Sequence, residues 1–564
     1  MFVPRLNLLY KQVITSSFCQ LLGNLTPSSC LNQDSGRSFN MATSLIEACN
    51  AATFSPSIFG ADILGIQANV VANYSVAAPE AYRYVAPTVE EQNATFCNVT
   101  VTYTHPGQND TINVEAWLPI DTWNGRLQAV GGGGWVAGRF FLSYAAMRGA
   151  LADGFATTST DAGLGSALEA SPWALASPGN VNLYNLQNFG SVSLEDQAVI
   201  GKSLIKDFYG RGPEFSYWTG CSQGGRQALM LAQRYPTAYD GIIAGAPAIH
   251  WTELFSYIQW PQQVMNELGS YPPACEFDAI TAAAIEACDG LDGVRDGVIS
   301  RVDECLHAFD PYAVVGKTIK CPELNGTHVR ITKSAATAVN ATWQGVPILS
   351  GRQTYHGIAP GAQLTGTSST AFGQPGLLST NCTSGDCVAA PVLLGVQWLQ
   401  LFVAKNPELD LATLSRSQFG DLVYAGEQQY NSLVGTQDAD LTKFRDAGGK
   451  MISFHGLADN IIPPKATETY YKAVADLSPD IRSFYRYFEV PGLGHCFGGV
   501  SSQPTQLFSQ LRHWVENGTA PEVSAVKLNA TGGTEHSRIL CPYPKQAEFD
   551  ANVPRAMIGA ENYK

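Results

Sequence analysis

The chain has 564 residues, of which 45% are apolar and 15% charged, and its formal net charge is −14. This composition is typical of a globular protein that is long enough to bury a large core. The negative balance, without any basic cluster, argues against nucleic acids and anionic membrane surfaces as partners.

Strand and helix patterns alternate between residues 100 and 247. Short apolar runs predict strands, and longer amphipathic runs predict helices. This alternation indicates a mainly parallel sheet with helices on both faces, which is the α/β class. The predicted elements are strands at 114–118, 127–130, 155–158, 215–218 and 241–247, and helices at 194–208 and 226–232.

The segment 220–224, Gly-Cys-Ser-Gln-Gly, lies between the last of these helices and the strand before it. A serine between glycines at a sharp strand-to-helix turn is the nucleophile elbow of the α/β-hydrolase fold. The turn would lift the hydroxyl of Ser222 out of the sheet, and the helix N-terminus would face developing negative charge. With 54 glycines in the chain, a simple glycine-rich turn is the alternative.

Partners for Ser222 follow far downstream, in the order that an α/β-hydrolase uses. An apolar strand runs into a loop that ends in Asp459, and a second strand, at 484–490, is followed by His495. We predict that His495 takes the proton of Ser222 as it attacks an ester carbonyl, while Asp459 orients the imidazole. His455 is the rival base, but it precedes the acid and falls at a strand end, which favours a structural role.

The reaction also needs backbone donors for the oxyanion. One predicted donor is the N–H of Gln223, which follows the nucleophile, and the other should come from an earlier loop at a strand end. Four glycines at 131–134 follow a predicted strand. Gly132 or Gly133 is therefore the second predicted donor, and a flexible linker is disfavoured because Trp135 leads out of the loop.

The α/β pattern stops at residue 248 and resumes near residue 446. Tryptophans, proline-rich turns and a glycine-rich stretch fill residues 248–445, which we interpret as an inserted lid domain that covers the site and sets specificity. The catalytic domain then comprises residues 44–247 and 446–564. Residues 1–43 form an N-terminal extension without the apolar run of a signal peptide. The apolar stretch 389–404 contains a proline and two glutamines and predicts a buried helix rather than a membrane span.

An acidic loop in the lid is a candidate metal site. Asp289, Asp292 and Asp296 lie within eight residues, and each is followed by glycine. Calcium prefers carboxylate and carbonyl oxygens on a tightly wound loop. The spacing is not that of an EF-hand, and a solvated acidic turn is the alternative. The scattered histidines predict no catalytic zinc site.

The combination of these motifs resembles the tannase and fungal feruloyl esterase family over about residues 45–545. Cys221 directly precedes the serine and Cys496 directly follows the histidine, as in that family's CS-D-HC motif. The resemblance implies an α/β-hydrolase fold with a large lid, and a disulfide between these two cysteines. It also implies a structural calcium ion in the lid, held by side chains of Asp289, Asp292 and Asp296 and by carbonyl oxygens of Val294 and Val298.

Cysteines and glycosylation signals favour a secreted glycoprotein. The chain has 13 cysteines, and N-x-S/T sequons occur at ten positions. The resemblance implies two further disulfides, Cys49–Cys97 and Cys288–Cys305. We also predict Cys275–Cys321 and Cys382–Cys387, which leaves Cys19, Cys30 and Cys541 without an assigned partner.

The expected function is that of a secreted serine carboxylesterase that needs no organic cofactor. Its expected substrate is a small or polysaccharide-linked phenolic ester, with feruloyl and related hydroxycinnamoyl esters as first choice. Galloyl esters are the runner-up, and a secondary-metabolite ester is a further alternative. A catalytically silent binding glycoprotein is the contrasting class, which the complete set of triad residues and flanking cysteines disfavours. The sequence does not predict the oligomeric state.

Overall fold

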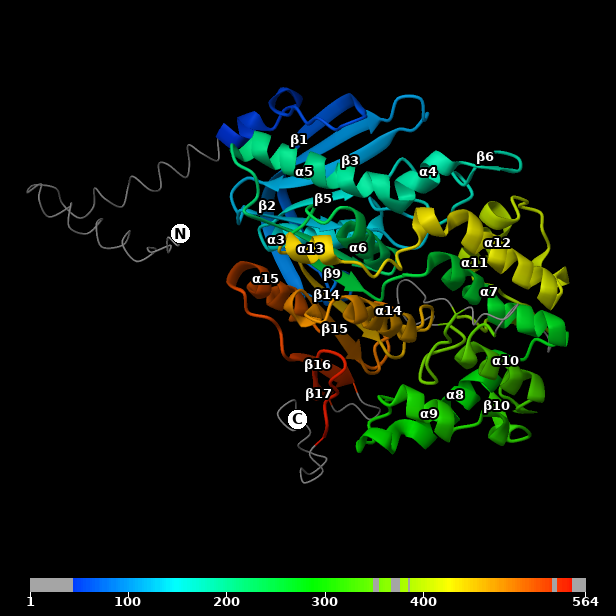
Figure 1. Cartoon of the computed structure of the whole chain (residues 1–564). Helices are drawn as coiled ribbons and strands as arrows, with labels where there is room; N and C mark the ends of the chain where they lie inside the picture. Colours follow the sequence, from blue (N-terminus) through cyan, green and yellow to red (C-terminus); the bar gives the residue numbers. More distant parts are fainter. Residues whose placement is uncertain (1–43, 348–354, 367–375, 384–385, 530–534, 550–564) are drawn as a thin grey trace, which may run out of the picture.

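The computed structural model describes residues 44–347, 355–366, 376–383, 386–529 and 535–549 (Figure 1). The predicted N-terminal extension, with Cys19 and Cys30, lies outside the described residues, as does much of the glycine-rich stretch of the lid. No helix within the described ranges combines the length and the hydropathy that crossing a membrane requires.

A nine-stranded sheet forms the centre of the predicted catalytic domain, in the order β1-β2-β3-β5-β4-β8-β9-β14-β15. Its strands are β1 Asp62–Ala78, β2 Val89–Thr104, β3 Ile112–Pro119, β4 Arg126–Val130, β5 Ala156–Thr160, β8 Phe215–Cys221, β9 Gly241–Gly245, β14 Lys450–Gly456 and β15 Tyr485–Val490. The strands from β5 to β15 are parallel, whereas β1, β2 and β3 are antiparallel additions. The predicted α/β class is confirmed.

Helices cover both faces of this sheet. They are α3 Phe141–Ala152, α5 Ser193–Tyr209, α6 Gln223–Arg234, α14 Pro464–Leu477 and α15 Leu507–Asn517. The core on one face contains apolar residues of α5, α6 and α14, and the core on the other face contains those of α3 and α15. The central strands β8 and β9 are therefore buried on both sides, which explains why their sequences are apolar without alternation.

The long hairpin of β1 and β2 is absent from the sequence-based prediction. Most side chains of β1 are exposed or half-buried, so the strand carries no clear apolar pattern. Its 17 residues pair with β2 through three irregularities in the register, and these break the period of two further. Tertiary pairing, rather than local pattern, thus determines this edge of the sheet.

The lid is a helical body beside the carboxyl ends of the parallel strands (Figure 1). Its elements are α7 Trp251–Leu268, α8 Ala274–Cys288, α9 Val302–Ala308, α10 Lys333–Gln344, α11 Leu393–Gln397 with a π-helix Trp398–Val403, α12 Arg416–Val434, and the hairpins β10 Thr318–Cys321 with β11 Thr327–Arg330 and β12 Thr380–Thr383 with β13 Asp386–Ala389. The helix expected over 389–404 begins at Leu393, because β13 extends to Ala389 and Val392 after Pro391 is extended.

The core of the lid also includes residues from the catalytic part of the sequence. Side chains between Leu164 and Phe189, and Trp135 of the glycine loop, belong to the same apolar cluster as α7 and α12. We call seven of these rings the Trp135 cluster: Trp135, Trp173, Phe189, Trp251, Phe255, Trp398 and Phe402. The ring centroid of Trp135 lies 5.1 Å from that of Trp251 and 4.8 Å from that of Phe402. The predicted domain boundaries stay a prediction.

Candidate active site

Ser222 lies at the turn between β8 and α6 in a conformation that few residues other than glycine adopt. Its φ is 63° and its ψ is −120°, and its N–H donates to the carbonyl of Gly245 at 3.0 Å. The turn needs the glycine at position 220, because a Cβ there would lie 2.5 Å from the carbonyl oxygen of Gly224. A strained, sharp turn of this kind presents a serine hydroxyl beyond the end of its strand.

His495 and Asp459 come together from the loops that follow β15 and β14. Nδ1 of His495 lies 2.8 Å from Oδ2 of Asp459. The other carboxylate oxygen accepts the backbone N–H groups of Ile461 and Ile462, at 2.9 and 2.8 Å. Burial alone would raise the pKa of Asp459, but the charge of His495 and hydrogen bonds from two histidines outweigh it and hold this pKa well below its usual range. Asp459 therefore stays ionised and fixes the orientation of His495.

His455, the rival base in the sequence analysis, occupies a different place. Its ring is fully buried in β14, with Nε2 at 3.2 Å from Oδ2 of Asp459. It is not among the residues that line the cavity beside Ser222. The geometry thus favours His495 as the base.

All five predicted disulfides are confirmed: Cys49–Cys97, Cys221–Cys496, Cys275–Cys321, Cys288–Cys305 and Cys382–Cys387. The Cys221–Cys496 bond joins the residue before Ser222 to the residue after His495, with a Cα–Cα distance of 6.0 Å. It connects the nucleophile turn covalently to the histidine loop. Cys541 has no disulfide partner among the described residues, and burial raises the pKa of its thiol.

The predicted oxyanion donors lie beside Ser222, but two of them already donate elsewhere. The N–H of Gly132 donates to Oε1 of Gln227 at 2.9 Å, and the N–H of Gly133 donates to the carbonyl of Val136 at 3.1 Å. Within the described part of the chain, no acceptor pairs with the N–H of Gly134, which has a φ of 55°. Gly132 cannot carry a side chain, since a Cβ would lie 1.9 Å from the carbonyl oxygen of Val136.

Arg226 is a buried cation that the sequence analysis misses. It lies one turn into α6, and its Nε donates to the side chain of Gln223 at 2.6 Å. Its other nitrogens donate to carbonyls of Phe189, Gly190 and Val434. One side chain therefore joins α6 both to the segment at 189–190 and to the end of α12. Burial, together with the charge of Arg234, lowers the pKa of Arg226 to about 9. The sequence offered one signal for this role, namely a charged residue within the apolar sequence of the predicted helix.

A cavity of about 550 Å³ opens between Ser222, His495 and the lid. Its wall is mostly apolar and includes Phe140, Phe141, Leu254, Phe255, Ile258 and Leu394. Glu169, which is exposed, is the one carboxylate among the lining residues that the structure describes. The cavity can hold a drug-sized ester with its carbonyl beside Ser222.

The acidic loop has oxygens that fit a cation. Oδ1 of Asp296 is buried and accepts no hydrogen bond from a described residue, and the same holds for the carbonyl oxygens of Val294 and Val298. Asp289 instead supports the loop, because its Oδ1 accepts three backbone N–H groups at 2.9–3.2 Å. Burial raises the pKa of Asp296, although the neighbouring Arg538 opposes this shift. A cation would satisfy these oxygens.

Arg538 lies against this loop and was not anticipated. It belongs to the C-terminal hairpin of β16 Ser524–Asn529 and β17 Glu535–Leu540. Its guanidinium pairs with Oδ2 of Asp296 and, at 3.1 Å, with Oδ2 of Asp292. Oδ1 of Asp292 accepts the backbone N–H of Val294 at 3.0 Å.

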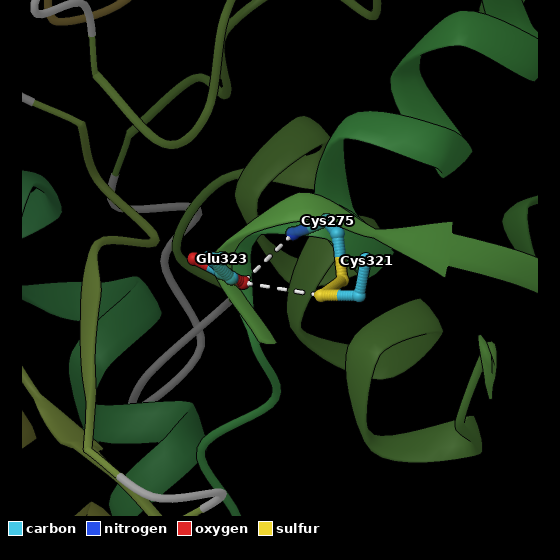
Figure 2. Close-up of side chains that lie close together, drawn as sticks. All are labelled: Cys275, Cys321 and Glu323. Carbon is cyan, nitrogen blue, oxygen red and sulfur yellow. Dashed lines mark hydrogen bonds between the residues drawn. A yellow bond between two sulfur atoms is a disulfide. The ribbon is translucent and has the colours of Figure 1, made fainter. Parts of the chain in front are cut away.

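Among the described residues, three potential metal ligands come within 4.8 Å of one another only at Cys275, Cys321 and Glu323 (Figure 2). The two sulfurs there are bonded to each other, and Glu323 accepts the backbone N–H of Cys275 at 3.1 Å. This group is a disulfide with a hydrogen-bonded neighbour rather than a metal site. The carboxylates of the acidic loop are more widely spaced than this group.

Comparisons with known proteins agree with the site. The family "Tannase and feruloyl esterase" matches residues 97–563. The chain is 37% identical over 524 residues to a "Probable feruloyl esterase" of Arthroderma benhamiae, covering 90% of both chains. It is 29% identical over 515 residues to a "Tannase" of Aspergillus oryzae, covering 81% of this chain and 84% of that one.

Solved structures give the same result. The tannin acyl hydrolase of Aspergillus niger has a TM-score of 0.78 at 29% identity, with 90% of this chain and 92% of that chain covered. Feruloyl esterase B of Aspergillus oryzae shares the fold, with a TM-score of 0.73 at 24% identity and coverage of 93% and 99%. The protein therefore belongs to the tannase and feruloyl esterase family, and it is a carboxylic ester hydrolase.

Proposed function

We propose that this esterase hydrolyses phenolic acid esters by acyl transfer to Ser222, with hydroxycinnamoyl esters such as feruloyl esters as its preferred substrates. The observation that carries the proposal is the joint placement of Ser222 and His495 at one apolar cavity, with His495 bonded to the buried Asp459. A relative named as a feruloyl esterase at 37% identity supports the same reading.

The proposed mechanism follows from the roles of these side chains. Because Nδ1 of His495 is bonded to Asp459, its Nε2 is the nitrogen that takes the proton of Ser222 as the oxygen attacks the ester carbonyl. The N–H of Gln223 and one N–H of the 132–134 loop stabilise the oxyanion. His495 then protonates the departing alcohol, and a water molecule, activated by the same nitrogen, hydrolyses the acyl-enzyme.

The wall of the cavity favours a cinnamoyl group over a galloyl group. A galloyl ring carries three hydroxyls, and each one that is buried without a partner costs about 1–3 kcal/mol. A feruloyl ring exposes one hydroxyl and one methoxy group, and its propenyl arm adds apolar surface that Phe255, Ile258 and Leu394 can cover. Glu169 can accept a hydrogen bond from one phenolic hydroxyl, and polar side chains such as Tyr84 and Gln397 are few in this apolar wall, which suits ferulate better than gallate.

We expect the specificity constant for methyl ferulate to exceed that for methyl gallate by at least about tenfold, which corresponds to one unpaired hydroxyl. Initial rates on methyl ferulate, methyl caffeate and methyl gallate measure this difference. Caffeate, which has two hydroxyls, should fall between the other two. A preference for gallate would contradict the feruloyl assignment and favour a tannase.

We also propose that the acidic loop binds calcium through Asp289, Asp292, Asp296 and the carbonyls of Val294 and Val298. When bound, the ion would hold the acidic loop in its native conformation. It would also stabilise the native state by mass action. The unpartnered oxygens of Asp296, Val294 and Val298 support this proposal.

Calcium removal gives a direct test. We expect a chelator to lower the melting temperature of the wild-type protein. We expect the Asp292→Ala variant to melt at a lower temperature than the wild-type protein, both with and without chelator. Glu304→Ala, at an exposed acidic side chain of α9 outside the loop, is the matched control and should behave like wild type. An identical wild-type melting temperature with calcium and with chelator would refute the calcium proposal.

We further propose that the protein acts outside the cell. Five disulfides support this, since such bonds persist in oxidising compartments. A serine-reactive fluorophosphonate probe applied to the culture medium tests secretion and catalysis together. Labelling there supports the esterase, whereas an abundant but unlabelled secreted protein would point to the silent binding glycoprotein.

A further inference from the structure

We propose that His455, held in one tautomer by Thr467, is a positioning residue that orients the catalytic carboxylate of Asp459. The inference rests on the proposed triad. His455 belongs to β14, Thr467 belongs to α14, and both side chains are completely buried. Neither touches the cavity in which the ester is expected to bind.

The hydrogen bonds of His455 determine where its proton lies. Nε2 is 3.1 Å from the carbonyl oxygen of Ile462, which can only accept, so Nε2 carries a hydrogen. Nδ1 is 2.8 Å from Oγ1 of Thr467, whose hydroxyl has no other hydrogen-bond partner among the described residues. A hydroxyl that donates to Nδ1 places the N–H of His455 on Nε2, which is the tautomer that we propose.

This N–H also reaches the catalytic acid. Nε2 of His455 lies 3.2 Å from Oδ2 of Asp459, the oxygen that accepts the bond from His495. Together with the two backbone donors on Oδ1, the carboxylate receives four hydrogen bonds. Two of them come from its own loop, and among the described side chains His455 is the one that connects the carboxylate to Thr467 of α14. Without His455, one side of Oδ2 would face a buried void and the carboxylate plane would be less constrained.

The proposed role has two consequences for catalysis. Small displacements of Asp459 turn the ring of His495 away from Ser222, and misplacement of about 1 Å can cost up to about 10²-fold in rate. A donor to a carboxylate also stabilises its negative charge. When that donor is removed, Asp459 attracts the imidazolium form of His495 more strongly, and the acid limb of the rate profile should move to higher pH.

Other ionisable groups face this region and need a control. Glu489 of β15 is paired in register with His455, and burial raises the pKa of Glu489 to about 7. Burial, with a smaller contribution from the charge of Asp459, raises the pKa values of Tyr257 and Tyr355 in the lid, so both stay neutral. Glu489 is thus the neighbouring group that titrates in the same range as the reaction, and Glu489→Gln separates its contribution.

The test compares His455→Leu with His455→Gln, whose side-chain amide can still donate to Asp459. For His455→Leu we expect kcat to fall by about 10- to 100-fold with KM nearly unchanged. We also expect the acid limb of kcat/KM to move up by about half a pH unit. His455→Gln should recover most of the rate and most of the pH profile. Glu489→Gln should leave the effect of His455→Leu in place.

A second pair of variants keeps the test decisive if His455→Leu fails to fold. Thr467→Val removes only the hydroxyl that fixes the tautomer and should produce the same changes on a smaller scale, whereas Thr467→Ser should resemble wild type. If Leu and Gln at position 455 are equally impaired with an unshifted acid limb, His455 is a packing residue and the inference is wrong. If Ser222→Ala stays active, the triad itself fails, which is a separate outcome.

Discussion

Replacing Ser222 by alanine is expected to lower kcat/KM by at least about 10⁴-fold while leaving the fold intact. Without the nucleophile, only the oxyanion donors and substrate binding still accelerate the reaction. Their acceleration over the uncatalysed reaction in water is small compared with that of the complete triad. The backbone strain at φ 63° is the same for both residues, since each has a Cβ, so stability should change little. Hydrolysis of methyl ferulate and a thermal melt measure the two quantities.

The control for this experiment is Ser509→Ala, at an exposed serine of α15 whose hydroxyl donates to the carbonyl of Gln506 at the start of the same helix. It should retain wild-type activity. The Ser222→Ala protein should also bind ferulate, because the wall of the cavity is unchanged. Residual activity above about one hundredth of wild type would mean that another residue is the nucleophile.

Replacing both Cys221 and Cys496 by serine is expected to have the second-largest effect. This bond closes a loop of 275 residues, and loss of a cross-link over a long loop costs about 2–5 kcal/mol. It also holds the turn of Ser222 against the loop of His495. Without it, the distance between the hydroxyl of Ser222 and the ring of His495 is less well defined. We expect kcat to fall by about 10²-fold even at temperatures where the protein remains folded.

The matched control is the double replacement of Cys49 and Cys97, a bond between the N-terminal segment and β2 with a sequence separation of 48. It should lower the melting temperature with little change in kcat. Peptide mapping without reductant provides an independent check. Free alkylation of Cys221 in the native protein would show that the bond is not formed in solution.

Local patterns were sufficient for the parts of this fold that carry the candidate site. Strands β8, β9, β14 and β15 are almost entirely buried and rich in apolar residues, and Gly220 and Gly224 flank Ser222 at the sharp turn. Each signal lies within about ten residues of sequence. The order of the acid and the histidine then follows from the fold class.

Other features depend on contacts between distant segments, which one sequence does not reveal. Arg226 is satisfied by carbonyls of residues 189, 190 and 434, and Arg538 reaches back over 240 residues to the acidic loop. His455 lies near the end of β14, as predicted, but its contact with Thr467 of the next helix could not be read from the sequence. The oxyanion loop could be located but its donor could not, since the choice depends on which N–H groups the fold has already used.

Trp135 follows the four glycines directly, and its indole is packed among six rings that come from residues 173–402. The insertion is consequently not a detachable module that a protein engineer could exchange at its two ends. A chimera that receives the lid of a relative would also have to receive a compatible ring at position 135 and the segment 164–189 that surrounds it. Substrate range in such a scaffold is therefore easier to change by altering residues on the cavity wall than by transplanting the insertion.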